Sequence, residues 1–234
     1  MKDYISIKEV QAKPMTVGEA KKLGLIRVNS MNMRSSDETP GYLVKYPDGY
    51  ESWSPKEIFE AAYTVSATPL DRLNIEQNAL AHLIVKLDAF VYSDKYEALD
   101  KLSQAMLVAQ LKSMIEYMTL LDKRLFHMQG QPIMLSGLNF RMAHMLIEAG
   151  YCVRRSGWNG KDLMVTRQVP AHITDEIIPR MQSLPKEAKR ILMETVKHID
   201  YDCQMLLINT ATGRADSWVP SSADLFADDW EIVL

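Results

Sequence analysis

The organising stretch of this chain is Arg154-Arg155-Ser156-Gly157-Trp158-Asn159-Gly160-Lys161. It gathers two arginines, a tryptophan, an asparagine and a lysine around two glycines. Because glycine tolerates left-handed or very tight backbone, Gly157 and Gly160 predict a turn that presents its side chains. Arginine offers a planar fork to phosphate, asparagine offers donors and acceptors, and tryptophan offers an aromatic face. The stretch suits a nucleotide-like ligand. The alternative is a β-turn with its tryptophan in the core and its charges solvated.

A second aromatic motif follows near the end of the chain. Ser217-Trp218-Val219-Pro220 leads into Ser221 to Leu225, and the chain closes with Asp229-Trp230-Glu231. Upstream of the glycine turn, the apolar run from Met142 to Val153 has the spacing of a helix that passes through Gly150 into a short strand. This order predicts a small helix-and-sheet module that contains both motifs.

Over residues 136–234 this order of motifs resembles the phage Thoeris anti-defence family of the second type. The resemblance implies a small α/β protein that assembles into oligomers and sequesters cyclic ADP-ribose-type signals without cleaving them. Between Val169 and Asp202 the chain is longer and more helical than the family pattern. We expect this departure to change the shape of one wall of the ligand pocket that the resemblance implies.

The predicted ligand-binding residues have aromatic, charged or hydrogen-bonding side chains and lie in the two motifs: Arg155, Trp158, Asn159, Lys161, Trp218, Ser221 and Asp224. One of the first two tryptophans stacks on a base. The arginine and the lysine face phosphates, while the asparagine with the serine or the aspartate hydrogen-bonds ribose or base edges. Trp230 lies in an alternating segment and is assigned to the core.

The middle of the chain predicts two long helices. Thr68-Pro69 begins the first, whose leucines repeat at heptad spacing, and a second apolar series runs from Leu99 to Leu125. Its apolar surface is wider than one partner helix can cover, which favours a homo-oligomer of even subunit number, a dimer or tetramer. The alternative is a hairpin that closes on the flanking domains. Residues 68–128 also resemble the helical hairpin of phage sponges that counter CBASS and Thoeris signalling, which implies assembly through helices and shared pockets.

The beginning of the chain predicts a second small module. A strand is expected at residues 4–10 and a short helix after Thr16, with Asn139 as the corresponding cap later in the chain. Ser52-Trp53-Ser54-Pro55 parallels the later Ser-Trp-x-Pro motif, so this module is interpreted as a possible degenerate repeat. The fold class is therefore α+β: two small sheet-and-helix modules, 1–67 and 136–234, flanking a long antiparallel helical hairpin, 68–128.

Composition narrows the function. A net charge of −3 and a pI of about 6.0 argue against binding to a nucleic acid polymer, which normally requires a basic surface. The two cysteines cannot build a disulfide framework. No apolar targeting core and no run of membrane-spanning length is present, so we expect no membrane partner and a cytoplasmic protein. The resemblance to a phage family implies the cytoplasm of the bacterial host.

No catalytic motif is recognised. The chain lacks both G-x-x-x-x-G-K-[ST] and G-x-G-x-x-G. Helices are expected at 174–182 and 185–199, so His198, Asp200 and their neighbours straddle a helix end and would face different ways. We therefore expect no catalytic residue, metal or cofactor, and a protein that is not an enzyme. The resemblance implies that it instead binds cyclic ADP-ribose isomers, with cyclic oligonucleotides as further candidates. The alternatives are a nucleotide-hydrolysing or -transferring enzyme and a phage assembly or adaptor protein without a small ligand.

Overall fold

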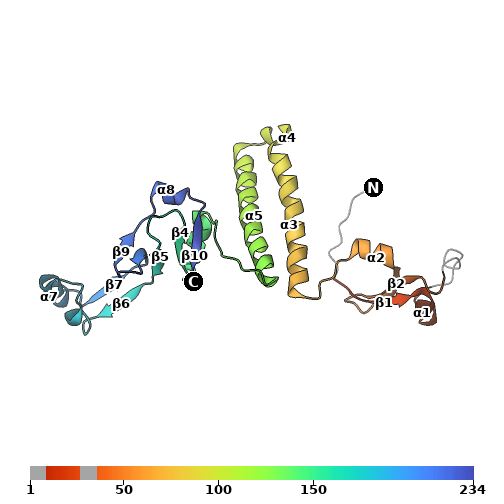
Figure 1. Ribbon diagram of the computed structural model, residues 1–234, viewed down its shortest axis with the longest axis horizontal. Helices are drawn as coiled ribbons and strands as arrows, with labels where there is room; N and C mark the ends of the chain where they lie inside the picture. Colours follow the sequence, from red (N-terminus) through yellow and green to blue (C-terminus); the bar gives the residue numbers. More distant parts are fainter. Residues whose placement is uncertain (1–8, 27–35) are drawn as a thin grey trace. The chain divides into compact units, whose positions relative to one another are not determined.

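The computed structural model describes residues 9–26 and 36–234, and its fold is a mixture of helix and sheet (Figure 1). Contacts divide the chain into two units, 1–79 and 80–234, with the boundary inside helix α3 (Pro69–Val91). The predicted division into three parts stays a prediction. Among the described residues, no helix is both long enough and apolar enough to cross a membrane.

The first unit is built on an antiparallel sheet in the order β1-β2-β3, formed by Gln11–Thr16, Pro40–Lys45 and Glu51–Pro55. Helix α1 (Val17–Lys22) is capped by Thr16, as predicted. The Thr16 side chain accepts the Glu19 amide, and the Glu19 carboxylate accepts the Thr16 amide in return. The expected strand at 4–10 falls mostly outside the described residues, since these begin at residue 9; the observed strand begins at Gln11.

The Ser-Trp-x-Pro motif of this unit lies in β3, the second strand of the β2–β3 hairpin, and leads into helix α2 (Lys56–Ala62). The Trp53 indole nitrogen donates to the Met15 carbonyl over 2.9 Å. Its ring lies so close to Gly41 that a Cβ there would come within 2.4 Å of it, so only glycine fits beneath the indole. The second unit has the same sequence of hairpin, Ser-Trp-x-Pro and short helix; that the two are repeats stays a prediction.

Two long helices occupy the middle of the chain, as predicted: α3 and α5 (Lys101–Met128), with the short α4 (Asp94–Glu97) between them. The side chains of Ser93 and Asp100 cap α4 and α5. The antiparallel arrangement of the two helices stays a prediction.

The second unit contains a five-stranded antiparallel sheet in the order β10-β4-β5-β8-β9. These strands are Trp230–Val233, Cys152–Arg155, Leu163–Gln168, Gln204–Asn209 and Ala215–Trp218. Helix α6 (Phe140–Glu148) is capped by Asn139, as predicted, and packs against β10, β4 and β5. Its buried face and the sheet form one core: Leu138, Met142, Ala143, Ile147, Val153, Val165, Ala227 and Trp230. Trp230 is 0% exposed, which confirms its assignment to the core.

The predicted helix at 174–182 is wrong, and the one predicted at 185–199 is present but ends at Glu194. Strands β6 (Ala171–Thr174) and β7 (His198–Tyr201) form a two-stranded ribbon, and only a 3-10 turn, Ile178–Arg180, and helix α7 (Lys186–Glu194) lie between them. The reason lies in strand register. Gln168 pairs with Gln204 in the main sheet and Ala171 pairs with Tyr201 in the ribbon, so the ribbon prolongs the β5–β8 hairpin without a shift.

The expected cluster at 198–203 changes with this correction. His198 and Asp200 lie on β7 rather than at a helix end, and the Nδ1 atom of His172, on β6, lies 2.6 Å from the Asp200 carboxylate. The rings of His172 and His198 stack with centroids 5.5 Å apart. Among the described residues, no cluster of histidine, cysteine and acidic side chains has the geometry to hold a metal ion.

The buried tryptophan at position 230 should dominate the stability of this unit. Trp230→Ala removes a fully buried indole and should lower the free energy of unfolding by about 3–5 kcal/mol. Phe226→Ala is the matched control, because that ring is 89% exposed and its loss should change stability by no more than about 0.5 kcal/mol. Denaturant unfolding of both variants measures the difference; equal losses would contradict the assignment.

Candidate functional site

The glycine turn, residues 156–161, connects β4 to β5 and stands beside the start of β10. Arg155 is the Cα partner of Trp230 in the β4–β10 pair, so the first residue of β10 fixes the position from which the turn departs. At the far end, the Arg154 guanidinium donates to the Lys161 carbonyl over 2.8 Å and to the Glu231 carboxylate over 2.7 Å. The turn is thus attached to the sheet at both ends.

The carboxylate of Asp224 ties the two sequence motifs together. Asp224 lies in α8 (Ser222–Leu225) and is 7% exposed. One of its oxygens accepts Nη1 of Arg155 over 3.0 Å and Nε1 of Trp158 over 3.2 Å. The other accepts the Ser221 hydroxyl over 2.7 Å and the Ser221 amide over 3.0 Å. Four donors therefore converge on one buried acid.

Burial would raise the pKa of Asp224, but the hydrogen bonds from Ser221, Arg155 and Trp158 outweigh it and hold that pKa below its ordinary value. Asp229 has a lowered pKa as well, mainly because the Arg155 guanidinium donates to it from Nε over 2.7 Å. Both ion pairs in turn raise the pKa of Arg155. The guanidinium thus lies between two carboxylates, a role that the sequence interpretation did not include.

An aromatic cluster lies beneath the turn. Trp158 is half-buried and meets Trp230 edge-on at a centroid distance of 5.4 Å, and Trp218 meets it at 6.1 Å. Phe140 completes the cluster at 5.5 Å from Trp230. The two interpretations of the turn are therefore combined: its tryptophan packs on the core, and it still leaves part of its surface to solvent.

The structure brings five of the seven predicted site residues together: Arg155, Trp158, Trp218, Ser221 and Asp224. Asn159 and Lys161 lie on the same turn but point no polar group at the others. Their side chains are exposed and make no hydrogen bond or ion pair with any residue that the structure describes. Whether the seven bind a ligand stays a prediction.

Sequence reasoning missed Asp229 as a partner of the turn. Its carboxylate contacts residues more than 70 positions earlier in the chain, and the neighbouring Asp228 points elsewhere. The only local signal was the Asp-Trp-Glu order at the start of a strand, which says nothing about what the first acid faces.

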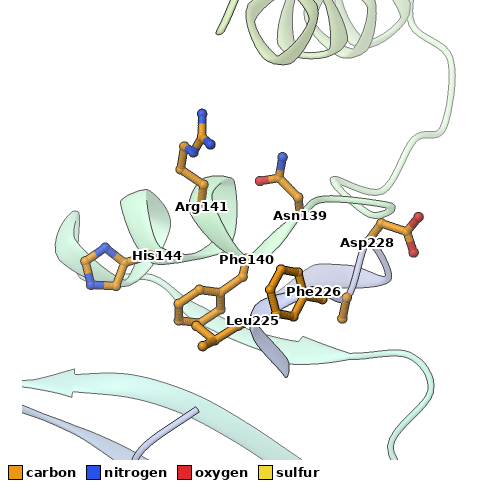
Figure 2. A pocket seen from close by; sticks show the side chains of 8 residues that line it. Asn139, Phe140, Arg141, His144, Leu225, Phe226 and Asp228 are labelled. Carbon is orange, nitrogen blue, oxygen red and sulfur yellow. The ribbon is translucent and has the colours of Figure 1, made fainter. Parts of the chain in front are cut away.

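A separate hollow of about 580 Å³ is lined by the segment 225–228 and by the beginning of α6 (Figure 2). Phe140, Leu225 and Phe226 gather along one side of it, and Asn139 and Arg141 project from the beginning of α6 on the other. The side chains of Asn139 and Arg141 already donate hydrogen bonds to Glu116 of α5, over 2.8 and 3.3 Å. None of the seven predicted residues lines this hollow.

Comparison with known proteins agrees with the resemblance noted from the motifs. Residues 138–233 match the family described as a Thoeris anti-defense 2-like domain, and residues 67–127 match the family described as Sequestin. A curated relative, Thoeris anti-defense 2 of Bacillus phage SP01, is 27% identical over 100 residues, which cover 43% of this chain and 99% of the relative. The C-terminal part of the chain, including the glycine turn, thus resembles the Thoeris anti-defence family.

The buried acid predicts how stability depends on pH. Because the folded-state pKa of Asp224 lies below the ordinary value of 3.8, its stabilising contribution is complete above about pH 4 and is lost as the pH falls through the folded pKa. Asp224→Asn removes this contribution, so the difference in unfolding free energy from the unsubstituted protein should be largest at neutral pH and shrink below about pH 4. Denaturant melts from pH 7 to 2.5 measure it. A difference that is constant over this range would contradict the role of the acid.

Proposed function

We propose that this protein binds cyclic nucleotide immune signals, above all isomers of cyclic ADP-ribose, and sequesters them without cleavage. The similarity of residues 138–233 to the Thoeris anti-defence family supports a phage anti-defence role. The observation that carries the proposal is that the match to the family, residues 138–233, includes the complete glycine turn with its supporting acids, while the similarity to the curated relative covers 99% of that relative.

The exposed groups of the turn suit an anionic ligand with an aromatic base. Lys161 supplies a cation and Asn159 an amide, and neither is engaged by another described residue. The part of Trp158 or Trp218 that solvent reaches offers a surface on which a base can stack, a contact worth about 1–3 kcal/mol. We therefore assign the first phosphate contact to Lys161 rather than to Arg155, whose charge is balanced by two carboxylates.

Binding without catalytic turnover agrees with the hydrogen bonding and the pKa shifts of Asp224 and Asp229. A general acid or base must be free to exchange a proton with the substrate and works best with a pKa near the operating pH. The carboxylate of Asp224 already accepts four donors, and the pKa of Asp224 and of Asp229 is lowered rather than raised. Arg155, Ser221 and Asp224 are accordingly assigned to holding the site in place.

One experiment distinguishes sequestration from its alternatives. The protein is mixed with a cyclic ADP-ribose isomer, free ligand is measured after ultrafiltration, and the complex is then denatured by heat. We expect free ligand to disappear and to return chemically intact. A product that accumulates with time would favour an enzyme. No ligand depletion and no change in melting temperature with any cyclic nucleotide would favour an adaptor without a small ligand.

Lys161 provides the sharpest test of the assigned contact. Lys161→Ala should weaken binding of the cyclic ADP-ribose isomer by roughly ten- to a hundredfold, since a hydrogen bond to a charged group is worth about 1.5–3 kcal/mol. It should also reduce the dependence of affinity on salt concentration. Lys186→Ala makes the same change of charge at the exposed beginning of α7 and should leave affinity unchanged. Calorimetric titration at two salt concentrations measures both effects, and equal affinities for the two variants would overturn the assignment.

We also propose that the chain forms a homo-oligomer of even subunit number through its long helices. Helix α5 exposes apolar side chains on two sides. Because successive residues of an α-helix are about 100° apart around its axis, Leu102 and Met106 share one side, and Val108 and Ile115 share the opposite side. A soluble helix seldom leaves that much apolar surface in water unless a partner covers it.

Light scattering tests this proposal. The mass should be an even multiple of 26.7 kDa at micromolar concentration. Leu102→Glu combined with Met106→Glu should lower it, because two buried charges would be unpaired in the interface. Both side chains are more than half exposed in the single chain, at 69% and 57%, so folding should be preserved. A monomer in the unsubstituted protein contradicts the proposal.

A further inference from the structure

We infer that Asp229 is a positioning residue, which clamps the first half of the glycine turn and thereby sets the position of the ligand-contacting groups that follow. The expected effect on ligand affinity rests on the proposed function. The clamp, meaning the hydrogen bonds that Asp229 accepts from residues 155–157, does not depend on any ligand.

Three consecutive residues, the last of β4 and the first two of the turn, donate to this one aspartate. Its Oδ1 accepts Nε of Arg155 over 2.7 Å, and its Oδ2 accepts the amide of Gly157 over 2.8 Å. Its own carbonyl accepts the amide of Ser156 over 3.0 Å. Hydrogen bonds to a charged acceptor are shorter and about twice as strong as those between neutral groups. One side chain and one peptide group therefore define the backbone path at the entry to the turn.

The clamp explains why position 157 is glycine. The sequence predicts left-handed or very tight backbone here; the left-handed alternative is wrong, because neither Gly157 nor Gly160 has a positive φ. A Cβ on residue 157 would instead lie 2.6 Å from Oδ2 of Asp229, a contact closer than real Cβ atoms make. The glycine leaves room for the carboxylate to approach the backbone, and any larger residue would displace that carboxylate, so residue 157 and residue 229 act as a matched pair.

The clamp is itself held firmly. Asp229 directly precedes Trp230, whose indole is fully buried and donates to the Asp224 carbonyl over 3.1 Å. The lowered pKa of Asp229 keeps its carboxylate ionised at neutral pH, so both oxygens remain acceptors. The core of the unit thus fixes the clamp, and the clamp fixes the turn.

Asn159 and Lys161 depend on this arrangement more than other residues of the turn. Their side chains contact no polar group among the described residues, so only the backbone path determines where they stand. That path is held by Asp229 at one end and by the hydrogen bond from Arg154 to the Lys161 carbonyl at the other. Loosening either end spreads the positions of the two side chains and weakens binding without removing any ligand contact.

The test compares two neighbouring aspartates. Asp229→Asn keeps the size of the side chain but places an amide group against donors that need an acceptor. Asp228→Asn makes the same chemical change at an exposed residue with no partner among the described residues. Affinity for the cyclic ADP-ribose isomer should fall at least tenfold in the first variant and stay within about twofold in the second, at a temperature where melting curves show both fully folded.

Gly157→Ala provides an independent second variant, since the added methyl displaces the same carboxylate. If the two residues act as a pair, Gly157→Ala and the Gly157→Ala/Asp229→Asn double variant should bind about equally, so that the effects are not additive. Additive losses, or an unchanged affinity of folded Asp229→Asn, would overturn the inference.

Hydrogen exchange at the Gly157 amide separates this inference from the proposed function. Its exchange rate should rise at least tenfold in Asp229→Asn and not in Asp228→Asn, with or without any ligand. If the unsubstituted protein binds no cyclic nucleotide, the proposed function fails. The exchange rate of the Gly157 amide still tests the clamp by itself: faster exchange in Asp229→Asn supports the clamp, and unchanged exchange refutes it.

Discussion

Four donors meet the carboxylate of Asp224 in a place that water hardly reaches. A buried acid with fewer partners would be costly, whereas a fully hydrogen-bonded one rigidifies what surrounds it. Here the donors come from the end of β4, from the glycine turn and from the cap of α8, and the carbonyl of the same residue accepts the indole N–H of Trp230. The position of the turn, the short helix and the last strand all follow from this one group, so the candidate site is as rigid as the core on which it stands.

Much of the fold can be read from local sequence. Caps such as Thr16 and Asn139 specify helix beginnings through interactions within three residues. The alternating pattern of the last strand indicates that Trp230 is buried. The β6–β7 ribbon cannot be predicted in this way. Its strands are short and are specified by their pairing with each other, which leaves no periodic pattern in the sequence. The amphipathic α7 between the strands instead suggests a longer helix than is present.

The candidate site shows the same limit. The residue types and their proximity follow from the motifs, whereas the pairing of Arg155 with Asp224 and Asp229 joins positions about 70 residues apart. Sequence therefore indicates which groups a ligand can use but not which of them the protein already uses. Arg155 and Lys161 look alike in the sequence and differ in the structure, since one is neutralised by carboxylates and the other is exposed.

The ribbon bears on how such a chain can vary. It grows from the end of β5 and the beginning of β8, whereas the glycine turn precedes β5 at the opposite end of that strand. Because the pairing of Gln168 with Gln204 continues in step to Ala171 and Tyr201, residues gained or lost in opposed pairs leave every side chain of the sheet on its original face. The ribbon can therefore become longer or shorter during evolution without changing the main sheet, and the glycine turn at the opposite end of β5 keeps its position.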